Sequence, residues 1–180
     1  MGIKNLWSLN VDEAILSEKV GKELGKEYQI FFPVNSQLKD IDLIIYNLKT
    51  QKTKSIQVKG SRTYVSKRLK KLGISENAKT SWNVIKSESI FSPTNEIDFF
   101  IFVLHQEDLK SNSRQIVQNY IIIPIKDFRD ITKKEKEMRK TGHYHYAFAA
   151  LKNKAIEVNN VKNKQIDFTK YLNNFDLLKL

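Results

Sequence analysis

The sequence has no cysteine, little proline or glycine, and no long apolar stretch. The absence of cysteine excludes disulfides and thiolate metal sites. The three prolines and six glycines form no linker, and there is no repeat or low-complexity tract, so we expect a single domain over residues 1–180. No apolar run approaches the roughly 20 residues of a membrane helix, and the first residues lack the apolar core of a signal peptide. We therefore expect a cytoplasmic protein with no membrane partner.

Acidic residues are scarce relative to basic ones. The chain has 31 Lys and Arg against 20 Asp and Glu, which gives a formal net charge of +11. Such a balance favours a polyanionic partner, and nucleic acid is the commonest one. Charge alone leaves open a solvated lysine-rich surface with no such role. Hydrophobic residues make up 41% of the chain, which is enough for a packed core.

Apolar periodicity predicts a mixed α/β fold. Leu16, Val20 and Leu24 recur at helical spacing and predict a helix over residues 11–27. Short β-rich runs predict strands over residues 28–32, 41–46, 55–59, 97–104 and 120–123. Two stretches predict helices over residues 128–140 and 166–178, the second with an apolar stripe that suits a core or a dimer interface. We expect a core over about residues 10–125 and a C-terminal helical extension over about residues 126–180.

The second and third predicted strands bring together the residues with the clearest chemistry. Asp42 opens one strand, and Gln57-Val58-Lys59 ends the next. Alternate side chains of a strand share a face, so Gln57 and Lys59 project together while Val58 enters the core. If the strands form a hairpin, Asp42 meets both of them. Oxygen ligands from Asp42, Gln57 and the Val58 carbonyl suit magnesium, and Lys59 is placed to orient a water molecule.

These residues resemble the core of PD-(D/E)XK nucleases, which share an α-β-β-β-α-β order. The resemblance rests on residues 28–35 (YQIFFPVN), 42–45 (DLII) and 56–62 (IQVKGSR), and covers about a third of the chain. It is closest to the branch of restriction and homing endonucleases in which glutamine replaces the acidic residue of the motif. The resemblance implies a restriction-endonuclease-like core, with a central mixed sheet flanked by helices.

The resemblance also implies roles for individual residues. Asp42 would be the metal-binding aspartate, Gln57 the D/E position and Lys59 the motif lysine. Family members often add a glutamate from the first helix, for which Glu18 is the preferred match by local sequence and Glu13 the rival by apolar stripe. The glutamine removes one negative charge from the site, so the helix glutamate is expected to restore affinity for Mg²⁺ or Mn²⁺.

The sequence therefore predicts a magnesium-dependent endonuclease that hydrolyses DNA, preferably double-stranded, with a possible homodimer as its working form. The alternatives are a catalytically inactive nuclease fold that binds nucleic acid, and a basic interaction domain without that role. A cluster of basic residues that follows the motif is expected to contact phosphates. Its members are Arg62, Lys67, Arg68, Lys70 and Lys71. Trp82 is either a core anchor or a platform for a base.

Overall fold

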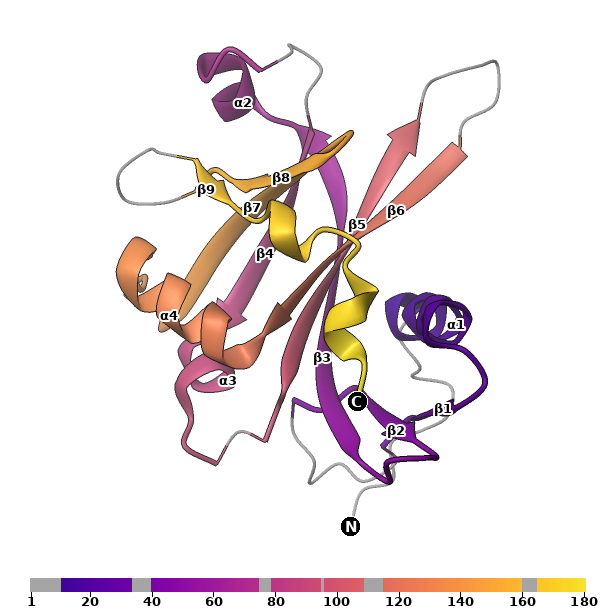
Figure 1. Ribbon diagram of the computed structural model, residues 1–180. Coiled ribbons are helices and arrows are strands. Elements are labelled where there is room, and N and C mark those ends of the chain that lie inside the picture. The colour runs from indigo at the N-terminus through magenta and orange to yellow at the C-terminus, as the bar shows by residue number, and fades with distance from the viewer. Residues whose placement is uncertain (1–10, 34–39, 75–78, 95, 109–114, 160–164) are drawn as a thin grey trace.

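The chain has a mixed α/β fold built on one large sheet (Figure 1). The computed structural model describes residues 11–33, 40–74, 79–94, 96–108, 115–159 and 165–180. Within them the α-helices are α1 (Val11–Leu24), α2 (Lys67–Lys71), α3 (Ser87–Phe91) and α4 (Ile125–Glu135). The strands are β1 (Tyr28–Phe31), β2 (Leu43–Asn47), β3 (Thr53–Val65), β4 (Lys79–Lys86), β5 (Phe99–Asp108), β6 (Gln115–Pro124), β7 (His143–Leu151), β8 (Lys154–Glu157) and β9 (Ile166–Asp167). Two short 3-10 helices, η2 (Thr169–Tyr171) and η3 (Phe175–Leu178), follow.

The long strand β3 joins the two halves of the sheet. Its first residues pair antiparallel with β2, which in turn pairs with β1. Its last residues pair antiparallel with β4, and the sheet continues through β7, β8 and β9. Between these pairings β3 runs parallel to β5, which carries β6 as a hairpin partner. In Figure 1 the β5–β6 hairpin and the β4–β7 pair diverge on either side of β3.

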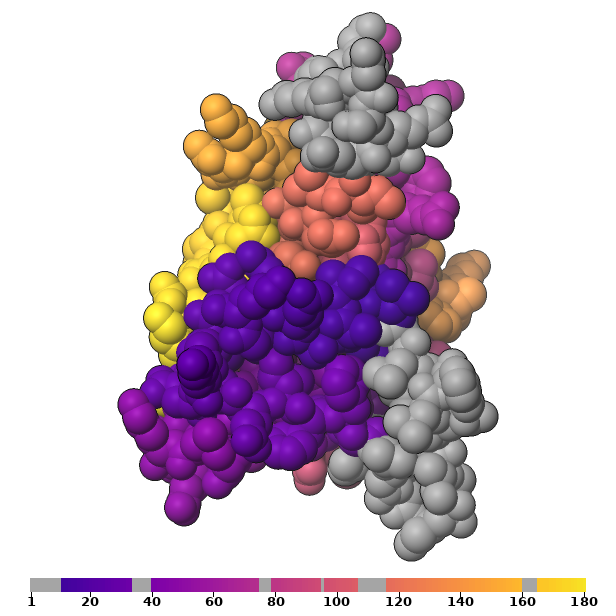
Figure 2. Space-filling model, turned by 90° about the vertical axis from the view of Figure 1, so that its right-hand side faces the viewer, coloured from indigo at the N-terminus to yellow at the C-terminus, as the bar shows by residue number. Residues whose placement is uncertain are grey.

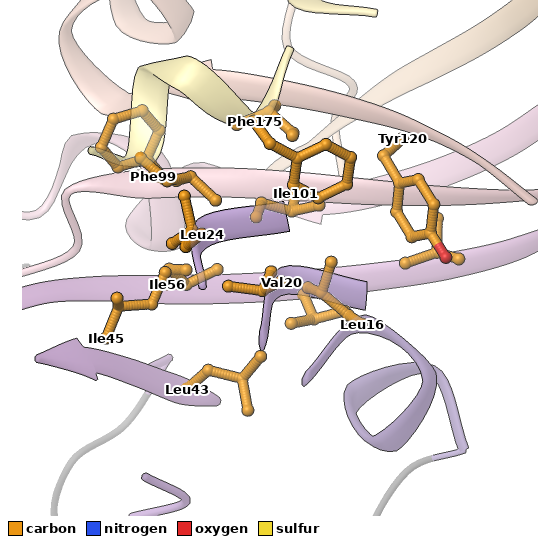
Figure 3. Close-up of a cluster of buried hydrophobic side chains, with 14 of the residues drawn as sticks. Leu16, Val20, Leu24, Leu43, Ile45, Ile56, Phe99, Ile101, Tyr120 and Phe175 are labelled. Atoms are coloured by element: carbon orange, nitrogen blue, oxygen red, sulfur yellow. The ribbon is translucent and has the colours of Figure 1, made fainter. Parts of the chain in front are cut away.

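Helix α1 covers one face of the first half of the sheet. Leu16 and Val20 are fully buried in a cluster with apolar residues of β2, β3, β5 and η3. Figure 3 shows these side chains and Leu24 beside Ile56 and Ile101 of the sheet. In Figure 2 the indigo atoms of the N-terminal segment, which includes α1, lie at the surface of the molecule. Each buried aliphatic side chain contributes about 1.5–3 kcal/mol, so this packing fixes α1 on β3.

The opposite face of β5 and β6 packs against β4, β7 and α4. Aromatic rings dominate this second core: Phe102 lies 4.7 Å from Phe148 and 5.6 Å from Phe128, measured between ring centroids. Tyr146 is 5.0 Å from Phe128 by the same measure. Tilted and edge-on ring pairs of this kind add to the free energy gained by burial. The sheet is therefore buried on both faces along β5, as its continuous apolar sequence indicates.

The structure confirms the order of the predicted helix and strands up to β6, with shifted ends. The first helix stops at Leu24 because Gly25 adopts φ +85°, a conformation that favours glycine, and its N–H closes on the Gly21 carbonyl. β3 extends six residues beyond the predicted end at Lys59. None of the helices within the described ranges combines the length and apolar content needed to cross a bilayer.

The expected C-terminal helical extension is wrong. The segment after α4 contributes β7, β8 and β9 to the sheet. The predicted helix over residues 166–178 is replaced by β9, η2 and η3. Asn173 interrupts it with φ +51°, and both its N–H and its Oδ1 bond to the backbone of Tyr120. The apolar stripe is buried inside the chain, with Phe168 and Leu178 at 0% exposure, so it forms core and not a dimer interface.

Candidate active site

Asp42 lies where the predicted hairpin places it, at the point where the β2–β3 ladder ends. The last pair of the ladder is Leu43 with Ile56, and the Asp42 N–H donates to the Ile56 carbonyl at 2.8 Å. The next position along β3 opposite Asp42 is Gln57. The Val58 N–H donates to Oδ2 of Asp42 at 2.7 Å, which fixes the carboxylate against β3.

Gln57 and Lys59 project from the face of β3 that points away from α1. Val58 packs in the α1 cluster, whereas Gln57 pairs in register with Phe100 of the aromatic core. The alternation predicted from the sequence is therefore confirmed. Gln57 is 2% exposed, so its amide is an interior polar group that needs partners.

A second carboxylate, Asp40, supplies one of those partners. The Gln57 Nε2 donates to Oδ1 of Asp40 at 2.8 Å. The Ser89 hydroxyl of α3 donates to the same oxygen at 3.1 Å. These two bonds hold the Asp40 carboxylate against Gln57. Asp42 contacts the neighbouring residue of β3, Val58. Asp40 has φ +69°, and aspartate is among the residues that tolerate this left-handed conformation.

The other amide atom of Gln57 is unsatisfied. Its Oε1 is buried and has no hydrogen-bond partner within the described part of the chain. Reversing the amide would place this oxygen against the Asp40 carboxylate, so hydrogen bonding fixes the orientation. A buried acceptor without a partner costs about 1–3 kcal/mol, and such atoms commonly mark the position of a water molecule or an ion.

Lys59 adds a positive charge on the same face. Its side chain is partly buried, two residues along β3 from Gln57. Among the described residues its ammonium has no hydrogen-bond or ion-pair partner. Strand geometry places alternate Cα atoms about 6.6 Å apart. Lys59 therefore projects from the same face as Gln57, at the next alternate position of β3.

The donor atoms of this cluster suit a hard cation. Asp40, Asp42 and Oε1 of Gln57 offer oxygen ligands, the type that Mg²⁺ takes while keeping several waters. The Val58 carbonyl, predicted as a ligand, points to the side of β3 on which Asp42 lies, because the N–H and carbonyl of a strand residue point to the same side and its N–H donates to Asp42. No group of three or more His, Asp or Glu side chains within the described ranges is placed to hold a metal ion. A metal bound here would therefore need the Gln57 amide oxygen and water molecules in addition to the two carboxylates.

Comparison with protein-family models, with curated proteins and with solved structures finds no match. The assignment of chemistry to this cluster consequently rests on its geometry.

The preference for Glu18 as the helix glutamate is wrong. Glu18 is on the exposed face of α1, 70% exposed, and forms an ion pair with Lys22 at 2.6 Å. Lys22 lowers the pKa of Glu18 through this hydrogen bond and its charge. Glu13 is the glutamate that faces the sheet, at 5% exposure beside Leu16. That face carries Val58, so the carboxylate that adjoins Gln57 is Asp40 and not either helix residue.

The basic residues predicted to contact phosphates lie on β3 and α2. Arg62 is exposed on β3, about 16 Å along the strand from Gln57 at about 3.3 Å per residue. Three exposed lysines, Lys67, Lys70 and Lys71, lie on α2. Arg68 instead bonds to the Val158 carbonyl at 3.1 Å and to Asn159, which ties α2 to the end of β8.

The sequence reasoning missed Asp40 and Ser89. Asp40 stands two positions before Asp42, but its left-handed φ of +69° interrupts the extended backbone, so strand periodicity gave no signal for its position. Nothing in the sequence links Ser89 to this site, because α3 reaches it only through the tertiary fold.

A further polar pair on the α1 side was also missed. His105 Nε2 lies 2.5 Å from Oδ1 of Asp12, and both side chains are less than one-fifth exposed. The Asp12 carboxylate rests on Gly60, where an added Cβ would lie 1.7 Å from Oδ2. Only glycine leaves room for this contact. The pair lies in a groove that also includes Arg62.

Proposed function

We propose that the chain is a metal-dependent endonuclease of the PD-(D/E)XK type that hydrolyses DNA phosphodiester bonds. The observation that carries the proposal is the pair of contacts at the end of β2, Gln57 with Asp40 and the Val58 N–H with Asp42, next to Lys59 on β3. Two carboxylates, an unsatisfied amide oxygen and an amine on one face of a sheet are the groups that phosphodiester hydrolysis requires.

The order of elements supports the same proposal. One helix and three antiparallel strands precede a strand, β5, that runs parallel to β3. The family order α-β-β-β-α-β fits this arrangement if the segment from α2 to α3 occupies the place of its second helix. The insertion of β4 into that segment is a departure from the family pattern.

Each residue has a role that follows from its contacts. Asp42 and Asp40 are held by β3 and α3, so neither needs to reorganise when a cation binds. The Gln57 oxygen would complete the ligand set. A bound Mg²⁺ or Mn²⁺ supplies positive charge to the phosphate and favours ionisation of a water molecule. Lys59 would hold that water or a phosphate oxygen through its ammonium.

Asp40 also compensates for the negative charge that is lost when glutamine stands at position 57. Replacing the acid of the motif by glutamine removes one negative charge, and Asp40 returns one to the same amide. A charge at 4 Å is worth about 4 kcal/mol at an effective dielectric of about 20. The site therefore keeps two carboxylates without a helix glutamate.

Cleavage of supercoiled plasmid in Mg²⁺ or Mn²⁺ tests the proposal. We expect nicking by the native chain, its loss in EDTA, and a decrease of at least about 100-fold in Lys59→Met and Asp42→Asn. Lys52→Met and Asp130→Asn change exposed residues of the same types and serve as matched controls. Absence of nicking by the native chain in both metals would overturn the proposal.

The alternative of an inactive nuclease fold that binds nucleic acid has one observation in its favour. The Gln57 amide donates to Asp40 and so occupies an oxygen that a metal would otherwise use. Duplex binding without nicking in the same experiment would favour this alternative. Absence of both binding and nicking at low salt would favour an interaction domain with no nucleic-acid role.

A further inference from the structure

The outer face of β4 and β7 carries exposed aromatic and apolar side chains that packing does not explain. Trp82 is 43% exposed and Val84 is 47% exposed. His145 of β7 lies opposite Val84 in the ladder, and its ring is 5.9 Å from that of Trp82. Helix α2 covers the neighbouring part of this face through Leu69, but not these three residues. We refer to Trp82, Val84 and His145 as the Trp82 surface.

A basic pocket of about 280 Å³ adjoins the Trp82 surface, with His145 in its wall. Its cations come from separate segments, with Arg68 on α2 and the others on the connection between α4 and β7. Glu137 is the acid among its lining residues. The cations of the pocket are Arg68, Lys136, Arg139 and Lys140.

Three of the four cations have no ion-pair partner within the described residues. Lys136 is 2% exposed and pairs with the buried Glu157 at 2.9 Å, so this pair is internally compensated. Arg68 bonds to uncharged acceptors, which hold the guanidinium in place and leave its charge available. Arg139 and Lys140 are exposed, and neither side chain has an ion-pair partner within the described residues.

His145 contributes a neutral ring between the pocket and Trp82. Burial lowers its pKa, and the charges of Arg139, His143 and Lys136 lower it further. This shift favours the uncharged form of the imidazole. The ring stands edge-on to Trp82, at an interplanar angle of 72°, and lies between Trp82 and the cations of the pocket.

We propose that the Trp82 surface and the basic pocket together bind an unpaired nucleic-acid strand, with a base stacked on Trp82 and backbone phosphates in the pocket. Stacking on an exposed ring needs a base whose face is free, which a duplex interior does not offer. The fixed Arg68 guanidinium and the exposed Arg139 and Lys140 match the oxygens of phosphodiesters. This inference rests on the proposed endonuclease function. It adds that the protein binds nucleic acid in a single-stranded form.

The test measures binding in EDTA, so that it does not depend on cleavage. Fluorescence anisotropy follows a labelled thymidine oligonucleotide of about 12 nucleotides at salt concentrations between about 50 and 200 mM. For the double variant Arg139→Ala/Lys140→Ala we expect the slope of log affinity against log salt to fall in magnitude by about 1.4, since each phosphate contact to a single strand contributes about 0.7. Lys26→Ala/Lys52→Ala removes two exposed cations elsewhere and is expected to leave the slope unchanged.

Two substitutions test Trp82. Trp82→Ala removes the aromatic ring, whereas Trp82→Phe keeps one and so separates a loss of stacking from a loss of folding. Trp82→Ala should weaken binding by about 5- to 100-fold, and Trp82→Phe should recover most of it. Circular dichroism confirms that each variant is folded. Equal binding by the two double variants, or no loss in a folded Trp82→Ala, would overturn the proposal, as would equal affinity for a blunt duplex of the same length. Binding with these dependences but without plasmid nicking would keep this inference while rejecting the endonuclease.

Discussion

Restoring the acid of the motif with Gln57→Glu gives a quantitative test of the site. Gln57 is 2% exposed and its Nε2 donates to Asp40 at 2.8 Å, so the substitution sets two carboxylates against each other in the interior. Two like charges at 4 Å repel by about 1 kcal/mol in bulk water and about 4 kcal/mol at an effective dielectric of about 20. Loss of a hydrogen bond to a charged acceptor adds about 1.5–3 kcal/mol. We expect a total loss of about 2.5–7 kcal/mol at neutral pH, depending on how far solvent screens the repulsion.

This loss has a distinctive dependence on pH and on metal. Protonation of either carboxyl removes the repulsion, so the difference from the native chain is largest at pH 8 and shrinks as the pH is lowered to 5. If the cluster binds Mg²⁺ as proposed, the variant offers an additional carboxylate, and Mg²⁺ should raise the stability of the variant more than that of the native chain. For a chain of this length the loss corresponds to a decrease of roughly 5–28 °C in Tm.

Thermal and urea unfolding with and without Mg²⁺ provide the assay. The double variant Asp40→Asn/Gln57→Glu exchanges the two groups, so the new amide donates to the new carboxylate and most of the stability should return. A folded Gln57→Glu as stable as the native chain in EDTA at pH 8 would refute the reasoning. So would a double variant that is no more stable than the single one.

Other substitutions test the surrounding structure. Lys136→Met should lower the free energy of unfolding in urea by about 3–5 kcal/mol because it leaves a buried carboxylate unpaired, whereas the exposed Lys134→Met should change it by less than about 0.5 kcal/mol. Gly60→Ala should cost about 1–3 kcal/mol in the same measurement, because the new methyl group displaces the Asp12 carboxylate. Gly21→Ala has its nearest neighbour at 3.8 Å within a helix and should instead raise stability by about 0.5–1 kcal/mol. Equal effects of the two lysine changes, or a stabilising Gly60→Ala, would contradict these packing assignments.

The part of the site that could be predicted from the sequence is the part set by local strand geometry. Asp42 begins an apolar run, and Gln57 and Lys59 alternate with an apolar Val58, so two-residue periodicity alone gives their common face. Pairing of the two strands then follows from their closeness along the chain. Ser89 was beyond such reasoning, because it approaches through the connection between β3 and β5.

The two glutamates of α1 show that helical periodicity predicts burial better than a short local sequence pattern does. Glu13 falls on the stripe of Leu16 and Val20, and it is buried; Glu18 matched a local pattern, and it is exposed. Burial is a physical consequence of helical periodicity, whereas a short pattern of residues arises by chance.

The C-terminal segment shows where periodicity misleads. Phe168, Tyr171, Phe175 and Leu178 recur at helical spacing and are all buried, yet they belong to separate short turns. Asn173 breaks the helix by adopting a left-handed conformation while it bonds to β6. Core contacts from two 3-10 helices thus reproduce the pattern of one amphipathic helix.

Binding of Mn²⁺ measured by electron paramagnetic resonance tests the central claim most directly. The free ion gives a strong signal that falls when the ion is held by a protein, so a titration counts bound metal without any nucleic acid. We expect the native chain to bind Mn²⁺, and Asp42→Asn to lose that binding while Asp130→Asn retains it. Identical titrations for the native chain and a folded Asp42→Asn would contradict the assignment of a metal to this cluster.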